Sequence, residues 1–170
     1  TAYITLNRPE SRNPISNEMK QELLDAFDIC DFDPSIRVVV IRGAGGTFSA
    51  GGDLAAMRKR IEEGKLGTRI SCRLGGEMNQ RLRNLKKPVI AWVEGAATGS
   101  GISLALACDF QIVGEHTKMA FSFVNIGYIP DSGAVYLVTR AVGTVKASEL
   151  FLSGRRFSGR EAADMGLVTV

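Results

Sequence analysis

One stretch of this 170-residue chain decides its fold: Arg37-Val-Val-Val-Ile-Arg-Gly-Ala-Gly-Gly-Thr-Phe-Ser-Ala-Gly-Gly-Asp-Leu54. The continuous β-branched run Arg37–Ile41 is typical of a strand buried on both faces of a parallel sheet. A glycine-rich loop, Gly43–Gly52, follows it, and Asp53–Glu63 reads as a helix. The stretch therefore predicts a strand, a loop and a helix in succession, as in α/β proteins.

The same order of elements recurs later in the chain. Pro88–Val93 reads as a second buried strand with Trp92 in the core, Gly95–Gly101 as a second loop, and a small-residue helix runs through Cys108. Ligand sites in such folds fall in loops at the carboxyl ends of strands, where both loops lie. Further strands are expected at Ala2–Asn7, Phe110–Val113, Lys118–Phe121 and within Gly166–Val170, and further helices from Ser16, at Ile70–Lys86, Ser132–Val142 and Val145–Ser153, and after Ser158.

Composition limits the function classes. The chain is 45% apolar and 23% charged, which predicts a single soluble domain over residues 1–170. The net charge is +3, and the basic residues are scattered along the chain, which does not predict a nucleic-acid interface. No apolar run is long enough to span a membrane. Cys30, Cys72 and Cys108 are far apart and lack a nearby histidine, so they predict neither disulfides nor a metal site. We therefore expect a cytoplasmic or organelle-matrix protein.

The two glycine-rich loops predict anion sites. Glycines let the backbone approach a ligand closely, and unpaired N–H groups at a helix start favour negative charge. If both loops converge on one carbonyl oxygen, they form an oxyanion hole. Either loop alone is equally well explained by tight packing. Neither matches a dinucleotide, phosphate-binding or esterase-elbow motif.

Four motifs together make a more specific pattern. They are Phe48–Leu54, Lys87–Ala91, the run Gly95–Asp109, and Ile126-Gly-Tyr-Ile-Pro-Asp-Ser-Gly133. In this order they resemble the crotonase (enoyl-CoA hydratase/isomerase) superfamily, and the match extends from Leu6-Asn-Arg-Pro9 to Ala162–Val168. The resemblance implies the ClpP/crotonase fold of stacked ββα units with a parallel sheet.

The resemblance also implies roles for particular residues. The backbone N–H groups of Gly52 and Ser100 take the positions of the oxyanion donors. Family members continue into a C-terminal helical segment that supports a homotrimer or a dimer of trimers. This chain lacks most of that segment, so we expect it to be truncated at its C-terminus.

The reaction depends on which acids and bases are present. Family hydratases resemble one another in two glutamates, but the corresponding positions here hold Ser103 and Phe123, which cannot exchange protons near neutral pH. Asp131 matches the carboxylate of isomerases of the phenylacetyl-CoA type. A single carboxylate suffices for a double-bond shift, so the resemblance favours an enoyl-CoA isomerase with Asp131 as proton carrier. Without the resemblance, a cap for a helix that starts there would be the preferred interpretation of Asp131.

Other functions stay open. A hydratase or acyl-CoA hydrolase could use Asp131 alone, and a non-catalytic acyl-CoA-binding protein could retain the fold. No cofactor is expected beyond coenzyme A as part of the substrate, with Arg12, Arg58 or Lys59 as phosphate partners if these cations are not simply solvated. Tyr136 is expected to pack in the interior, and Asp53 to be structural. The residues expected to contact the substrate are Arg12, Pro14, Ala50, Gly52, Asp53, Leu54, Thr98, Ser100, Ser103, Phe123, Tyr128 and Asp131.

Overall fold

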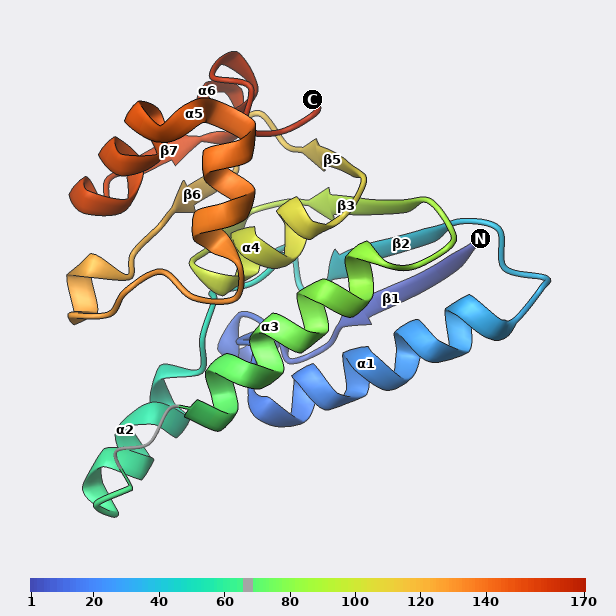
Figure 1. Cartoon of the computed structure of the whole chain (residues 1–170), viewed down its shortest axis with the longest axis horizontal. Coiled ribbons are helices and arrows are strands. Elements are labelled where there is room, and N and C mark those ends of the chain that lie inside the picture. The colour runs from blue at the N-terminus through green and yellow to red at the C-terminus, as the bar shows by residue number, and fades with distance from the viewer. Residues whose placement is uncertain (66–68) are drawn as a thin grey trace.

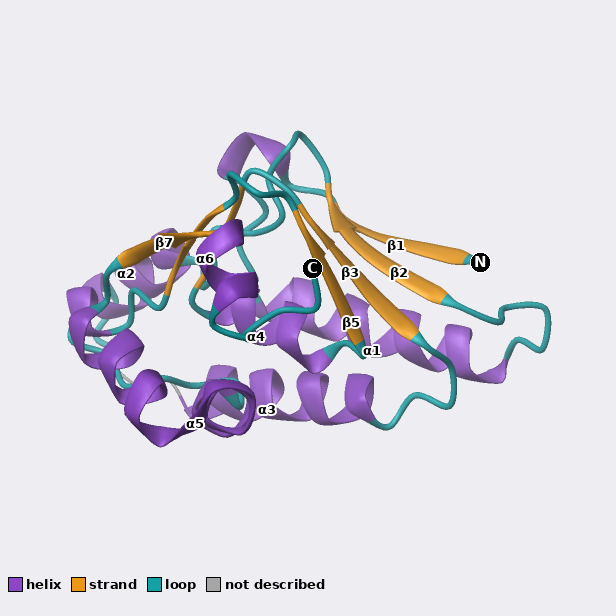
Figure 2. Cartoon of the chain, turned by 90° about the horizontal axis from the view of Figure 1, so that it is seen from above, coloured by secondary structure: helices purple, strands orange, loops and turns teal. Residues whose placement is uncertain are grey.

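A four-stranded parallel sheet forms the centre of the protein, which a computed structural model describes at residues 1–65 and 69–170 (Figure 1). Its strand order is β1-β2-β3-β5, made of β1 (Ala2–Leu6), β2 (Val39–Gly43), β3 (Val89–Val93) and β5 (Phe110–Val113). One face of the sheet carries three helices, α1 (Asn17–Phe32), α3 (Arg69–Arg83) and α4 (Ser100–Ala107) (Figure 2). The predicted α/β fold with a parallel sheet is confirmed.

A smaller three-stranded sheet adjoins the first. Strand β4 (Ala96–Thr98) pairs in parallel with β6 (Lys118–Ala120), which pairs antiparallel with β7 (Arg156–Ser158). The remaining elements are α2 (Leu54–Glu62), α5 (Ala134–Ser153), α6 (Gly159–Asp164) and the 3-10 turns η1 (Pro9–Ser11) and η2 (Val124–Ile126).

Local sequence signals explain where several helices begin or break. The Ser16 side chain accepts a hydrogen bond from the Met19 N–H and caps α1, and Ser158 forms a capping box with Glu161 before α6. Gly143 has φ 77° and ψ 165° and interrupts α5. This interruption lies between Val142 and Val145, where two separate helices were predicted.

The central sheet is covered less completely than predicted. Val39, Val40 and Ile41 of β2 are all buried, as expected for a strand covered on both faces. In β3, however, buried and less buried residues alternate, and Trp92 is 41% exposed. The prediction that Trp92 lies in the core is therefore wrong. Its cross-strand neighbour Ile112 is also exposed, so the neighbouring strands share an uncovered position on this face of the sheet.

Two further predictions were wrong. Tyr136 is exposed on α5 rather than packed in the interior. The end of the chain, Gly166–Val170, is not a strand. Gly166 turns the backbone with a φ of 74°, and only the last residue, Val170, exchanges backbone hydrogen bonds with the neighbouring Gln111 and Val113.

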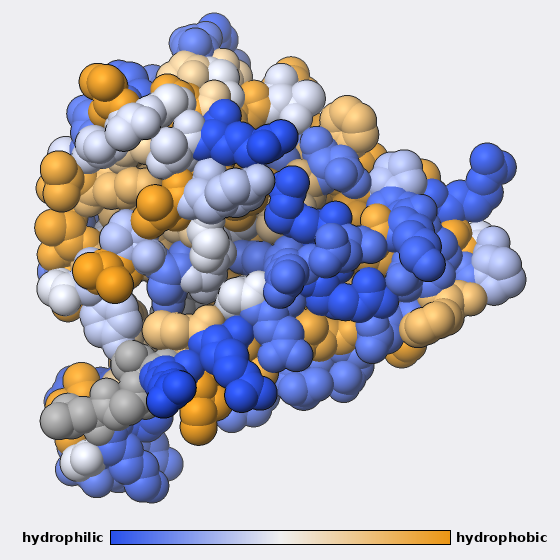
Figure 3. Space-filling view, viewed as in Figure 1, coloured by the Kyte–Doolittle hydropathy of each residue, from blue (hydrophilic) through white to orange (hydrophobic). Residues whose placement is uncertain are grey.

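The surface over α1 and α3 is mostly hydrophilic in Figure 3. Exposed apolar side chains occur on α5 and on the segment before it, among them Ile126, Ile129, Val135 and Val145. In residues 1–65 and 69–170, no helix is both long enough and apolar enough to cross a membrane.

Candidate active site

The two glycine-rich loops are bound to each other by backbone hydrogen bonds. The Ser49 N–H donates to the Ala96 carbonyl over 3.1 Å, and the Thr98 N–H donates to the Ser49 carbonyl over 3.0 Å. The Thr98 hydroxyl adds a bond of 2.6 Å to the Ala50 carbonyl. These contacts hold the end of the first loop beside the beginning of α4.

Gly51 and Gly101 allow this close approach. A Cβ on Gly51 would lie 2.6 Å from the Thr98 carbonyl oxygen, and one on Gly101 would lie 2.8 Å from the Ser49 Cβ. Gly51 also has a φ of 88°, which side chains other than glycine rarely adopt. The glycines are therefore required where the loops touch.

Gly52 and Ser100 line one cavity of about 320 Å³. Within the described ranges, neither N–H donates a hydrogen bond to the protein. Ser100 is the first residue of α4, where N–H groups have no intrahelical acceptor and the helix dipole is positive. Each group is therefore free to donate to a ligand oxygen atom and to stabilise negative charge on it.

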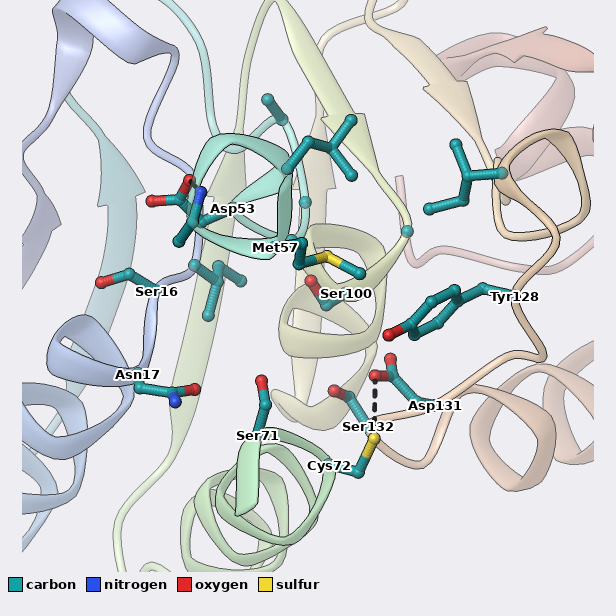
Figure 4. A pocket seen from close by; sticks show the side chains of 18 of the residues that line it. Ser16, Asn17, Asp53, Met57, Ser71, Cys72, Ser100, Tyr128, Asp131 and Ser132 are labelled. Carbon is teal, nitrogen blue, oxygen red and sulfur yellow. Dashed lines mark hydrogen bonds between the residues drawn. The ribbon is translucent and has the colours of Figure 1, made fainter. Parts of the chain in front are cut away.

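Asp131 lines the same cavity and faces Cys72 of α3 (Figure 4). The Cys72 thiol donates to the Asp131 carboxylate with an Sγ–Oδ2 distance of 3.8 Å. Asp131 does not cap α5, so that alternative is wrong. Ser132 and Gly133 have φ values of 51° and 74° and turn the chain, and α5 begins only at Ala134.

The turn after Asp131 is fixed by α3. The Asn79 side-chain amide donates to the Ser132 carbonyl over 2.7 Å. Gly75 leaves room for the buried Ser132 side chain, whose Oγ would lie 2.5 Å from a Cβ at that position. The position of Asp131 thus depends on contacts between α3 and the residue that follows it.

Two other carboxylates line the cavity. Asp53 is held by partners within the protein, and Glu18 is exposed to solvent. Asp53 caps α2 through the Ala56 N–H and forms an ion pair with Arg8 at 3.0 Å. Burial acts to raise the pKa of Asp53, but these two partners outweigh it, and the net shift is downward. Glu18 is exposed in the first turn of α1. Among residues 1–65 and 69–170, the side-chain hydrogen bond to the Asp131 carboxylate comes from a thiol alone.

Comparison with known proteins gives the family. The family model for enoyl-CoA hydratase/isomerase matches residues 1–170. The chain belongs to the enoyl-CoA hydratase/isomerase family. It is 33% identical to the trans-2-decenoyl-[acyl-carrier-protein] isomerase of Streptococcus mutans and 42% identical to a putative enoyl-CoA hydratase of Thermus thermophilus, over 98% of its own residues in each case.

The crystal structure of an enoyl-CoA hydratase from Polaromonas sp. JS666 superposes on 98% of the chain with a TM-score of 0.91 and 37% identity, and the chain covers 65% of it. The chain spans 64% of the Streptococcus relative and 66% of the Thermus relative, which is less than two thirds of either protein.

The cavity of this enoyl-CoA hydratase/isomerase family member includes most of the predicted contact residues. Those that line it are Ala50, Gly52, Asp53, Leu54, Thr98, Ser100, Phe123, Tyr128 and Asp131. Arg12, Pro14 and Ser103 do not line it. Ser103 is fully buried within α4, and its hydroxyl donates to the Gly99 carbonyl over 3.4 Å.

Sequence reasoning missed the polar wall that α1 and α3 contribute. Asn17, Lys20, Ser71 and Cys72 line the cavity on this side. The signal was a lysine on an otherwise apolar helix stripe: Leu23, Phe27 and Cys30 follow Lys20 at helical spacing and are all buried.

Proposed function

We propose that the protein is an enoyl-CoA isomerase. The thioester oxygen accepts hydrogen bonds from the Gly52 and Ser100 N–H groups, which stabilise the dienolate formed when a proton leaves the acyl chain. Asp131 takes this proton from one carbon and returns it to another, which moves the double bond without adding or removing atoms. The observation that carries the proposal is that these three residues line one cavity.

Hydration needs further groups that this cavity does not supply at the expected positions. In place of the two hydratase glutamates, Phe123 presents an apolar side chain and Ser103 lies outside the cavity wall. The competing proposal is a hydratase, favoured by relatives whose names say hydratase. It would require Asp131 alone to activate water.

The group that carries the acyl chain as a thioester is proposed to be coenzyme A. Lys59 and Arg60 of α2 line the cavity and are suited to phosphate oxygens. Arg58 forms an ion pair with Glu62 at 2.9 Å and is the weaker candidate. The Streptococcus relative is named for an acyl-carrier-protein substrate, so both carriers should be assayed. A homotrimer or a dimer of trimers is the assembly that we propose.

The test is Asp131→Asn, which keeps the shape of the side chain and removes the base. We expect isomerisation of 3-enoyl-CoA to fall by about 10²- to 10⁴-fold, with an unchanged circular dichroism spectrum and melting temperature. Glu18→Gln is the matched control, because Glu18 is another carboxylate of the cavity wall, and it should retain activity. Unchanged isomerisation in Asp131→Asn would refute the assignment.

A second assay separates isomerase from hydratase. Incubation of 2-enoyl- and 3-enoyl-CoA in ¹⁸O-labelled water should shift the double bond without incorporating the label. Label in a hydroxyacyl product would instead support the hydratase.

A further inference from the structure

Lys20 lies where its helix otherwise buries apolar side chains. Only 5% of Lys20 is exposed, and it lines the cavity. Lysine is rarely buried to this degree unless a partner compensates its charge.

The Lys20 ammonium is held by neutral oxygens. Nζ donates to the Ser71 Oγ over 2.7 Å, to the Ser71 carbonyl over 3.0 Å and to the Asn17 Oδ1 over 3.4 Å. Burial lowers the pKa of Lys20, while the negative charge of Asp131 opposes this shift. The hydrogen bonds of the ammonium are thus formed, but none of these three partners carries a negative charge.

Ser71 extends this site into the cavity. Its hydroxyl accepts a hydrogen bond from Lys20, which leaves its own hydrogen to donate to another acceptor. The longest of the three ammonium contacts, to Asn17, is also the easiest to exchange for a ligand oxygen. Figure 4 shows Asn17 across the cavity from Tyr128, with Ser71 between Asn17 and Asp131.

We propose that Lys20 and Ser71 bind a carboxylate at the far end of the acyl group, so that the protein prefers acyl thioesters ending in a carboxylate to those ending in a methyl group. The ammonium supplies the charge and one exchanged hydrogen bond, and the Ser71 hydroxyl supplies a second. This inference rests on the proposed function, because it places the thioester oxygen at the Gly52 and Ser100 N–H groups.

Equilibrium binding tests the preference without requiring turnover. Saturated acyl-CoA thioesters of equal length, one ending in a carboxylate and one in a methyl group, are titrated calorimetrically into the intact protein and into Lys20→Met. We expect the wild type to bind the carboxylate-ended ligand more tightly. In Lys20→Met that ligand should lose about tenfold or more in affinity and the methyl-ended ligand less than about twofold.

Three results would overturn the inference. They are a wild type without a preference, a preference that survives in Lys20→Met, and an equal loss of affinity for both ligands, which would indicate a role for Lys20 towards the coenzyme. Methionine is close to lysine in volume, so the fold should persist. If it does not, Ser71→Ala, which removes only the hydroxyl, should reduce the preference, and an unchanged preference there counts against the inference. A carboxylate preference in a protein without isomerase activity would refute only the isomerase reaction and would leave intact the placement of the thioester on which this inference rests.

Discussion

The contact between Cys72 and Asp131 is compatible with the proposed role of Asp131 as the proton carrier. A thiol is a weak hydrogen-bond donor, so the 3.8 Å contact orients the carboxylate without neutralising its charge. Asp53, in the same cavity, is instead held by a backbone N–H and a guanidinium. Because of these different partners, Asp53 serves the structure, whereas Asp131 is available for proton transfer.

The three thiols should differ sharply in reactivity. Burial raises the pKa of Cys30 and of Cys108, which keeps both protonated, whereas Cys72 is half-buried in the cavity wall. Ellman's reagent at pH 8 should therefore modify one thiol of the native protein rapidly, and saturating acyl-CoA should slow this reaction. Cys72→Ser should lack the rapid phase. Equal rates for all three thiols would contradict this accessibility.

At the scale of single residues, the sequence predicts which residues line the site better than it predicts which side chains elsewhere are exposed. The two glycine-rich loops were predicted because loop chemistry is local, and the resemblance to a known family selected Gly52 and Ser100 within them. Trp92 and Tyr136 were misplaced because their exposure depends on which faces of β3 and α5 other elements cover, which no local pattern records. Lys20 was missed because its apolar helix stripe indicates only that the position is buried, not that it faces a cavity.

Among the elements, the geometry of the site depends on the join between the two glycine-rich loops, by which we mean the backbone hydrogen bonds from Ser49 to Ala96 and from Thr98 to Ser49. It places the end of the first loop against β4 and the start of α4. Sequence could predict separately the strand before each loop, the loop itself and the helix after it. It could not predict their contact, because the hydrogen bonds join residues far apart in the chain. The resemblance to a known family supplied that information.

Gly51→Ala should disrupt this join. The substitution forces a side chain into a φ of 88° and against the Thr98 carbonyl oxygen, and we expect it to lower the free energy of unfolding by about 1–3 kcal/mol and to reduce activity strongly. Gly76→Ala, in α3 with open space around the new Cβ, is the control and should stabilise by about 0.5–1 kcal/mol. Urea unfolding measures both. Equal stabilities for the two variants would show that the join tolerates a side chain.

Across the whole molecule, ion pairs and hydrogen bonds lower the pKa values of several surface carboxylates. The Arg155 guanidinium lowers the pKa of Glu149, the Lys86 backbone N–H lowers that of Asp31, and the Ser158 backbone N–H lowers that of Glu161. These groups bind protons less readily in the folded state than in the unfolded state. Their contribution to stability is present above their ordinary pKa values of 3.8 for Asp and 4.5 for Glu.

The protein should therefore lose stability in acid. As pH falls through the lowered pKa values, the unfolded state takes up more protons than the folded state, and the urea midpoint should decrease steadily from about pH 5 to about pH 3. Urea unfolding at a series of pH values measures this. In Arg155→Met the decrease should be smaller, because Glu149 loses the partner that lowers its pKa. A constant midpoint over this range would show that these contacts do not affect the folding equilibrium.

Trp92 is the only tryptophan of the chain, and it lies on the open face of the central sheet rather than in the cavity wall. Its emission should therefore respond to unfolding of the sheet and to quenching by iodide, but hardly to an acyl thioester bound on the other side. The protein thus carries its own fluorophore for following stability in the presence of any ligand.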